Sequence, residues 1–254
     1  MSIPRLTANA AYATPVRRSP ARPEPPRLPM RHYTNLWLRD DGGIEEREQM
    51  APALPLFDAA HSAFARGTLI TTTRGPVAIE DLLPGDLLQT SAHGPLPVLW
   101  IGRMTLRPED IASRSVKLTR IMADAFGIAR PMADLLAGPG ARILTRPRNM
   151  RASIGSDHVL SPAHVLADGL HAFGVTPPRA VTFYHLWLRR HALITANGLE
   201  VESFHPGAGF ERDVGPSMLS LFLSLFPQIQ EPHQFGPLAH LRLPLDAPDT
   251  LSVA

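Results

Sequence analysis

The sequence of 254 residues contains no cysteine, and Lys117 is its only lysine. The lack of cysteine excludes disulfide bonds, cysteine-ligated zinc and thiol catalysis, and it leaves the redox compartment undetermined. No stretch approaches the ~20 apolar residues that cross a bilayer. The first residues also lack a continuous apolar run followed by a cleavage site. We therefore expect a cytoplasmic protein without a membrane span.

A strong excess of either charge is lacking as well. The formal net charge is +2, with 44% hydrophobic and 19% charged residues, which is ordinary for a globular protein. Beyond the N-terminal part the arginines are scattered, so nucleic-acid binding is not expected. The chain has no G-x-S-x-G motif, P-loop or dinucleotide fingerprint, which leaves hydrolase, kinase and dehydrogenase functions without support.

Proline is abundant, with 27 residues spread along the chain. Because proline interrupts helices and central strands, long regular elements should be few. Residues 1–31 combine seven prolines and six arginines with one acid, Glu24, which predicts disorder. We extend this Pro/Arg-rich, largely disordered arm and linker to residue 57. Within it, residues 44–50 (IEEREQM) have an acidic, helical composition, and residues 32–57 fit either a docking segment or a short strand with a helical turn.

From residue 58 onward the pattern becomes typical of short strands. Residues 68–72 are rich in β-branched side chains, and residues 77–80 alternate between apolar and other side chains. Residues 98–102 (VLWIG) form a short apolar run, and residues 181–195 are typical of paired strands. Glycine and proline turns separate these segments. The pattern predicts a mainly β, compact antiparallel domain over residues 58–207.

Helical texture is limited to two places in this part of the chain. Residues 121–137 predict short helical turns, because Gly127 and Pro131 interrupt them. Residues 216–229 begin with proline and run apolar until Pro227, which predicts a short packed helix. We therefore expect a few short helices, with residues 208–254 as a C-terminal helical tail of the same domain.

Several segments, in order, resemble the Hedgehog/intein (Hint) family, and specifically its bacterial stand-alone branch. Residues 63–68 (AFARGT) are similar to the family pattern Cys-Phe-x-x-Gly-Thr, and residues 79–86 (IEDLLPGD) to E-D-L-x-x-G-D. Residues 98–102 resemble V-x-W-I-G. Residues 184–204 resemble the closing motif, and residues 226–239 the tail of this branch. The resemblance covers roughly residues 58–243 and implies the Hint fold.

The resemblance also implies a chemistry. Hint domains cleave their own backbone: a Cys or Ser attacks the carbonyl of the preceding residue, and a histidine of a T/S-x-x-H motif protonates the scissile amide. The substrate is the domain's own N-terminal segment, and no metal or cofactor takes part. Here the nucleophile position is Ala63, which has no lone pair. The neighbouring Ser62 is an alternative, although a one-residue shift in a strand turns the side chain to the opposite face.

The histidine position can be placed in two registers. Residues 160–164 (LSPAH) match S-P-x-H and would supply His164. Alternatively, residues 134–144 (DLLAGPGARIL) correspond to the family segment that contains S-P-x-H, and residues 159–169 to a later one. We favour this second register because it accounts for both segments. It places Ala141 at the histidine position.

His185 and His191 remain at family positions of the closing motif. Their spacing lacks a third ligand, so a metal site is weakly indicated, and hydrogen-bonded histidines on paired strands are the plainer interpretation. Splicing inteins end in His-Asn, whereas this chain has Glu202-Ser203, which cannot cyclise in that way.

The sequence thus predicts a catalytically degenerate Hint-type domain that serves as a binding or structural module. Its protein partner is unidentified. The alternative is an active autoprocessing domain that uses Ser62 or His164 in a shifted register.

Overall fold

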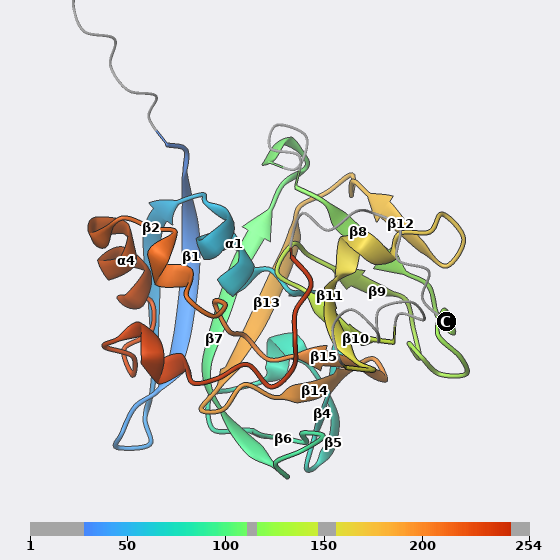
Figure 1. Cartoon of the computed structure of the whole chain (residues 1–254), viewed down its shortest axis with the longest axis horizontal. Helices are drawn as coiled ribbons and strands as arrows, with labels where there is room; N and C mark the ends of the chain where they lie inside the picture. Colours follow the sequence, from blue (N-terminus) through green and yellow to red (C-terminus); the bar gives the residue numbers. More distant parts are fainter. Residues whose placement is uncertain (1–27, 111–115, 147–155, 245–254) are drawn as a thin grey trace, which may run out of the picture.

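The computed structural model describes residues 28–110, 116–146 and 156–244 (Figure 1). The first 27 residues of the expected arm lie outside these ranges. The strands are β1 (Met30–Leu38), β2 (Ile44–Pro52), β3 (Phe64–Ala65), β4 (Leu69–Thr72), β5 (Gly75–Ala78), β6 (Leu87–Leu88), β7 (Leu96–Leu106), β8 (Leu118–Ile121), β9 (Leu135–Ala137), β10 (Arg142–Thr145), β11 (Val159–Pro162), β12 (Ala172–Val175), β13 (Val181–Leu188), β14 (Leu193–Ala196) and β15 (Leu199–Glu202). The helices are α1 (Pro55–His61) and α4 (Pro216–Leu223), and the 3-10 turns are η1 (Ile79–Asp81), η2 (Ala163–Leu166), η3 (Phe210–Arg212) and η4 (Pro232–Phe235).

The strands form one continuous, strongly curved antiparallel arrangement. Its main path runs β11-β10-β15-β14-β4-β6-β7-β13-β3-β9-β8-β12, with β5 on β4 and the β1–β2 hairpin on β7. Every strand pair within the described residues is antiparallel. The predicted mainly β, antiparallel fold is therefore confirmed.

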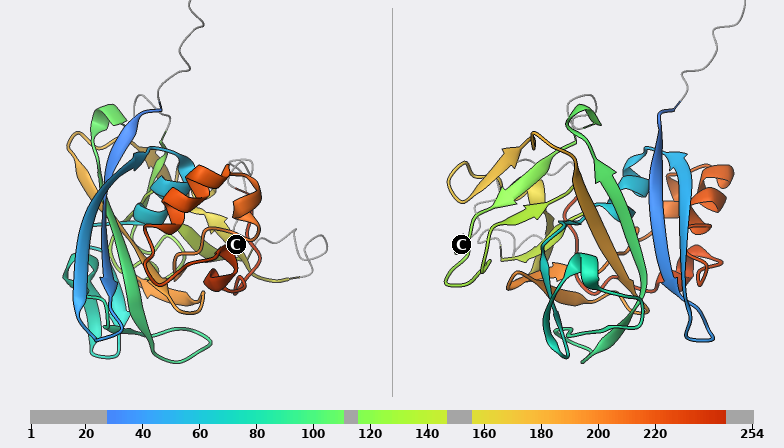
Figure 2. Two further views of the ribbon diagram at one scale, coloured as in Figure 1. Left: turned by 90° about the vertical axis from the view of Figure 1, so that its left-hand side faces the viewer. Right: turned by 180° about the vertical axis from the view of Figure 1, so that it is seen from behind.

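β7 connects the two halves of the fold. Its first residues pair with β6, and its remainder lies between β1 and β13 (Figures 1 and 2). The sequence motif VLWIG lies in this strand, as the apolar run predicted. Its glycine is required by packing: a Cβ on Gly102 would lie 2.6 Å from the carbonyl oxygen of Ala60 in α1. The motif therefore lets α1 cross closely over the sheet.

The expectation that residues 30–57 belong to a largely disordered arm is wrong. They form the β1–β2 hairpin and the first three residues of α1, and β1 pairs with β7 over residues 34–37. Tyr33 and Trp37 point into the core at 0% and 5% exposure. The alternation of inward side chains along β1 was the signal for a strand, but the proline-rich flanks obscured it.

The acidic helical interpretation of residues 44–50 is also wrong, because these residues lie in β2. The charged side chains suit an edge strand with a solvated face, and tertiary pairing with β1 overrides their helical propensity. Residues 122–134 likewise form turns between β8 and β9 instead of helical turns. Residues 181–195 do form strands, but β13 and β14 pair with other strands and not with each other.

The C-terminal residues cover the side of the sheet that carries the hairpin (Figure 2). Trp100 of β7 donates a hydrogen bond from Nε1 to the carbonyl of Leu225 at 2.7 Å. The rings of Phe204 and Phe226 stack with centroids 5.4 Å apart and planes 5° from parallel. Phe222 and Phe235 complete this aromatic cluster and are almost fully buried. Residues 208–243 thus share an apolar core with the sheet.

Candidate functional site

The Ser62–Ala63 junction lies in the interior, between the end of α1 and the start of β3. Ala63 is 0% exposed. Its N–H donates to the carbonyl of Tyr184 at 3.1 Å, and its carbonyl accepts the N–H of Gly138 at 2.8 Å. The closing motif, which contains Tyr184, is therefore in direct contact with the position that corresponds to the family's nucleophile.

The hydroxyl and the carbonyl of Ser62 are both hydrogen-bonded to backbone groups. Its Oγ donates to the carbonyl of Asp58 at 2.5 Å, which closes the last turn of α1. Its own carbonyl, which a nucleophile at residue 63 would attack, accepts the N–H of Gly140 at 3.0 Å. Both groups are buried, since Ser62 is 0% exposed.

The turn formed by residues 138–141 packs against this junction. A Cβ at Gly138 would overlap the carbonyl oxygen of Ser62, and a Cβ at Gly140 would overlap that of Ala59. The close approach therefore depends on both glycines. In the register that we favour, Gly138 occupies the serine position of the family's S-P-x-H pattern, so the structure has no room there for the side chain that the pattern would supply.

Ala141 and Ala63 belong to one apolar cluster, with exposures of 1% and 0%. His164 lines a surface cleft together with Lys117 and Val175, and neither Ser62 nor Ala63 lines that cleft. The structure thus brings the turn with Ala141, and not the His164 imidazole, to the junction. The catalytic roles assigned to these positions stay predictions.

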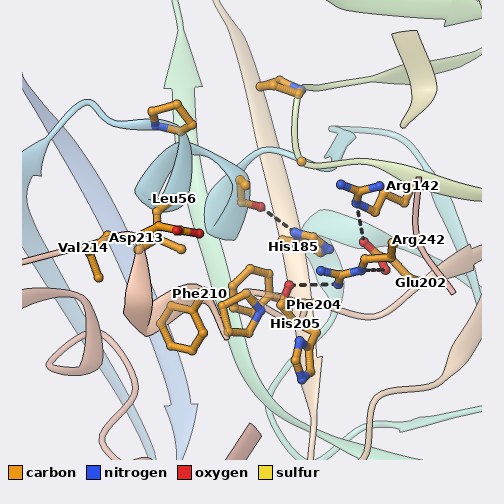
Figure 3. Close-up of a pocket in the computed structure, with 15 residues that line it drawn as sticks. Leu56, Arg142, His185, Glu202, Phe204, His205, Phe210, Asp213, Val214 and Arg242 are labelled. Atoms are coloured by element: carbon orange, nitrogen blue, oxygen red, sulfur yellow. Dashed lines mark hydrogen bonds and ion pairs between the residues drawn. The ribbon is translucent and has the colours of Figure 1, made fainter. Parts of the chain in front are cut away.

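A pocket of about 210 Å³ opens beside the same junction (Figure 3). It is lined by residues of α1, the 138–141 turn, β10, β13, β15 and the C-terminal part of the chain: Pro55, Leu56, Ala59, Pro139, Gly140, Arg142, His185, Glu202, Phe204, His205, Pro206, Phe210, Asp213, Val214 and Arg242. Figure 3 shows Leu56, Val214, Phe210 and the charged Asp213 on one side, the charged residues Arg142, Glu202 and Arg242 on the other, and His185 between them.

His185 is held by the carbonyl of Ala59 in α1. Its Nδ1 donates to that oxygen at 2.7 Å, because a carbonyl can only accept. Burial lowers the pKa of His185 to about 4, so the imidazole is neutral at pH 7. The lone pair is therefore on Nε2, which is buried and has no hydrogen-bond partner within the described residues.

Glu202 is the centre of the charged side of the pocket. Its carboxylate lies 2.9 Å from Nε of Arg242 and 3.5 Å from Nε of Arg142, and its side chain is 2% exposed. Burial by itself raises the pKa of Glu202, but Arg242, His191 and Arg142 outweigh burial and hold the pKa below its ordinary value. Burial also lowers the pKa of Arg142 to about 10, which leaves the guanidinium charged at pH 7.

His191 lies outside the pocket lining and hydrogen-bonds to Glu202. The N–H of Ala239 donates to its Nδ1 at 2.9 Å, so Nε2 carries the proton and donates to Glu202 at 3.2 Å. His185 and His191 thus have different environments: His185 lines the pocket, whereas His191 is fully hydrogen-bonded.

Sequence reasoning missed part of this pocket. The motifs did not point to Arg142, although it follows Ala141 directly. Glu202 was considered only because it stands where splicing inteins have a histidine. His205 was assigned no role, yet it lines the pocket, with Nε2 donating to the carbonyl of Gly236 at 2.9 Å. Arg242 lies 40 residues from Glu202 in the sequence, and no local pattern links the two.

Neither a metal site nor a membrane-spanning helix is found in the described part of the chain. No group of three or more His, Cys, Asp or Glu side chains there could hold a metal ion. Within residues 28–110, 116–146 and 156–244, no helix is long and apolar enough to cross a bilayer.

The fold is the mainly antiparallel β-domain that the sequence resemblance implied, and the comparison with known families agrees. The family model of the Hint domain matches residues 62–208, which is more than half of the chain. The chain therefore belongs to the Hint domain family, and the resemblance drawn from the motifs is confirmed. No curated protein matches the chain. Its place in the bacterial stand-alone branch stays a prediction.

Proposed function

We propose that this Hint domain no longer cleaves its own backbone and serves as a binding or structural module. The observation that carries the proposal is the environment of residue 63: a methyl group, fully buried in an apolar cluster, stands where the family has its nucleophile. A methyl group cannot attack a carbonyl, and burial keeps external nucleophiles such as water and thiols away from the Ser62 carbonyl.

The packing of the N-terminal side supports the same proposal. Cleavage at this junction would separate residues 1–62 from the remainder, yet β1 is hydrogen-bonded to β7 and α1 packs closely on Gly102. The segment that an active domain would release is here part of the core. Tyr33, Phe57 and Ala60 contribute to that core, each at 0% exposure.

One element of a catalytic arrangement remains. The N–H of Gly140 donates to the Ser62 carbonyl at 3.0 Å, in the position of a donor that would stabilise a developing oxyanion. Without a nucleophile and a proton donor, this donor has no reaction to accelerate. Ala141 supplies no acid, and the Ser62 hydroxyl is bonded to the Asp58 carbonyl.

The proposal predicts that the purified chain keeps its full mass. We expect a single species after prolonged incubation at neutral pH with dithiothreitol or hydroxylamine, because an enzyme must lower the barrier of amide cleavage by ~8 kcal/mol or more to matter. Intact-mass spectrometry is the measurement. A fragment that begins at Ser62 or at Ala63 and forms within hours would refute the proposal. A start at Ser62 would favour the alternative in which Ser62 is the nucleophile, because a nucleophile attacks the carbonyl of the residue before it.

Restoring the nucleophile and the proton donor tests whether these two groups alone account for the absence of self-cleavage. The single change Ala63→Cys should leave the chain intact, since the amide would still lack its proton donor. The double change Ala63→Cys with Ala141→His should restore thiol-dependent cleavage at the same bond, aided by the Gly140 donor. Urea unfolding of both variants serves as the control, because a histidine at a 1% exposed position strains the core by ~1–3 kcal/mol. A folded but silent double variant would assign part of the loss to Gly138.

A further inference from the structure

The pocket beside the junction contains an unused hydrogen-bond acceptor. Nε2 of His185 carries a lone pair, is buried and has no partner among the residues that the structure describes. Buried polar atoms in folded proteins almost always have a partner, because an unpaired one has lost its hydration without compensation. His185 is one of the residues that line the pocket, so a molecule from outside the chain can supply the donor.

The charges around the pocket select a neutral donor. Two guanidinium groups, those of Arg142 and Arg242, line the pocket together with two carboxylates, those of Glu202 and Asp213, so the lining charges balance and do not attract a cationic ligand. A carboxylate or phosphate is disfavoured for a different reason: its oxygens would face the lone pair of His185 Nε2. Both arginines also donate within the protein, Arg142 to the Leu243 carbonyl at 2.7 Å and Arg242 to the His205 carbonyl at 2.9 Å, which leaves fewer of their N–H groups for an anion.

Apart from the exposed Asp213, the opposite side of the pocket is apolar and partly aromatic. Leu56 and Val214 are half-buried there, while Phe204 and Phe210 are 2% and 8% exposed. The volume of about 210 Å³ is below the ~300–1,000 Å³ that is typical of sites for drug-sized ligands. The ligand is therefore small, and aromatic ring edges favour another flat ring.

We propose that this pocket binds a small neutral aromatic alcohol of the phenol class, whose hydroxyl donates to Nε2 of His185 and whose ring packs against Phe204 and Phe210. The inference names a ligand class for the binding role proposed above and rests on that role.

Phenol is the probe, and anisole, which has the same ring and no donor, is its matched control. In full-length protein labelled with ¹⁵N-histidine, phenol should shift the His185 Nε2 resonance saturably. Anisole should bind about 2- to 10-fold more weakly, the difference that one net hydrogen bond makes, and should leave that resonance unshifted. Equal affinities, or no saturable shift because a water already bonds Nε2, would overturn the proposal.

Three variants test the site itself. His185→Phe keeps a ring and removes the acceptor, so phenol should lose its advantage over anisole. If that variant does not fold, Val214→Trp fills the pocket from its half-exposed edge and should abolish binding, whereas Val175→Trp on β12, outside the pocket, should not. Phenol binding that survives Val214→Trp refutes the site. The mass of the same samples tests self-cleavage separately, so the two proposals fail independently.

Discussion

The change Gly138→Ser tests how far the junction has departed from the family pattern. It introduces the serine of S-P-x-H at the position that the structure leaves without a side chain. The new Cβ would overlap the carbonyl oxygen of Ser62 and lie 3.0 Å from Cδ1 of Phe183, closer than the 3.4 Å of ordinary contact. The carbonyl is backbone, so the whole turn must move.

The cost follows from what that movement breaks. The Gly138 N–H bonds the Ala63 carbonyl at 2.8 Å, and the Gly140 N–H bonds the Ser62 carbonyl at 3.0 Å. Each buried group left unpaired costs ~1–3 kcal/mol, and overpacking of a dense core costs about as much. We expect Gly138→Ser to reduce the free energy of unfolding by ~3 kcal/mol or more.

Urea unfolding followed by tryptophan fluorescence measures this difference. The matched control is Gly174→Ser on β12, where an added Cβ meets nothing within 4 Å, so its effect should be within ~0.5 kcal/mol. A Gly138→Ser protein that unfolds at the same urea concentration as this control would refute the reasoning. It would mean that the junction accommodates the family's hydroxyl without strain.

Two further predictions concern the buried charges and histidines. Glu202→Gln should destabilise the fold by ~3 kcal/mol, because it leaves buried guanidinium groups without their carboxylate. The control Glu200→Gln, a more exposed change on the same strand, should cost under ~1 kcal/mol. Equal unfolding midpoints of the two variants in urea would contradict this prediction. Burial lowers the pKa values of His61, His185 and His205 to about 3, 4 and 4. Since the unfolded chain takes up protons near pH 6.5 and the folded chain does not, stability should be full above that pH and fall below it. The loss should reach up to ~2 kcal/mol per histidine at pH 5, and unfolding midpoints that do not change between pH 7.5 and 5 would refute it.

The sequence by itself determined the family and much of the sheet. The apolar run of residues 98–102 identified the strand that connects the two halves of the fold, and the ordered motifs identified the Hint domain. The motifs also predicted that Ala63 and Ala141 stand at the nucleophile and histidine positions, and these assignments stay predictions. These features are local, because strand periodicity and motif spacing are properties of consecutive residues.

Tertiary structure decided what the N-terminal segment does. Its composition indicated an arm, and the charges of residues 44–50 indicated a helix, yet both strands form because β7 offers β1 an edge to pair with. Propensity is a weak guide where pairing and burial compete with it. The consequence is functional, since the segment that cleavage would release is built into the core.

Only the tertiary structure assembled the pocket. Arg142, His185, Glu202 and Arg242 come from β10, β13, β15 and the C-terminal part of the chain, and no spacing in the sequence relates them. The orientation of the His185 ring likewise depends on a contact with Ala59, 126 residues away, and leaves Nε2 without a partner among the described residues. Local patterns report which residues are apolar or turn-forming. Which polar groups meet, and which one is left without a partner, depends on how distant segments pack together.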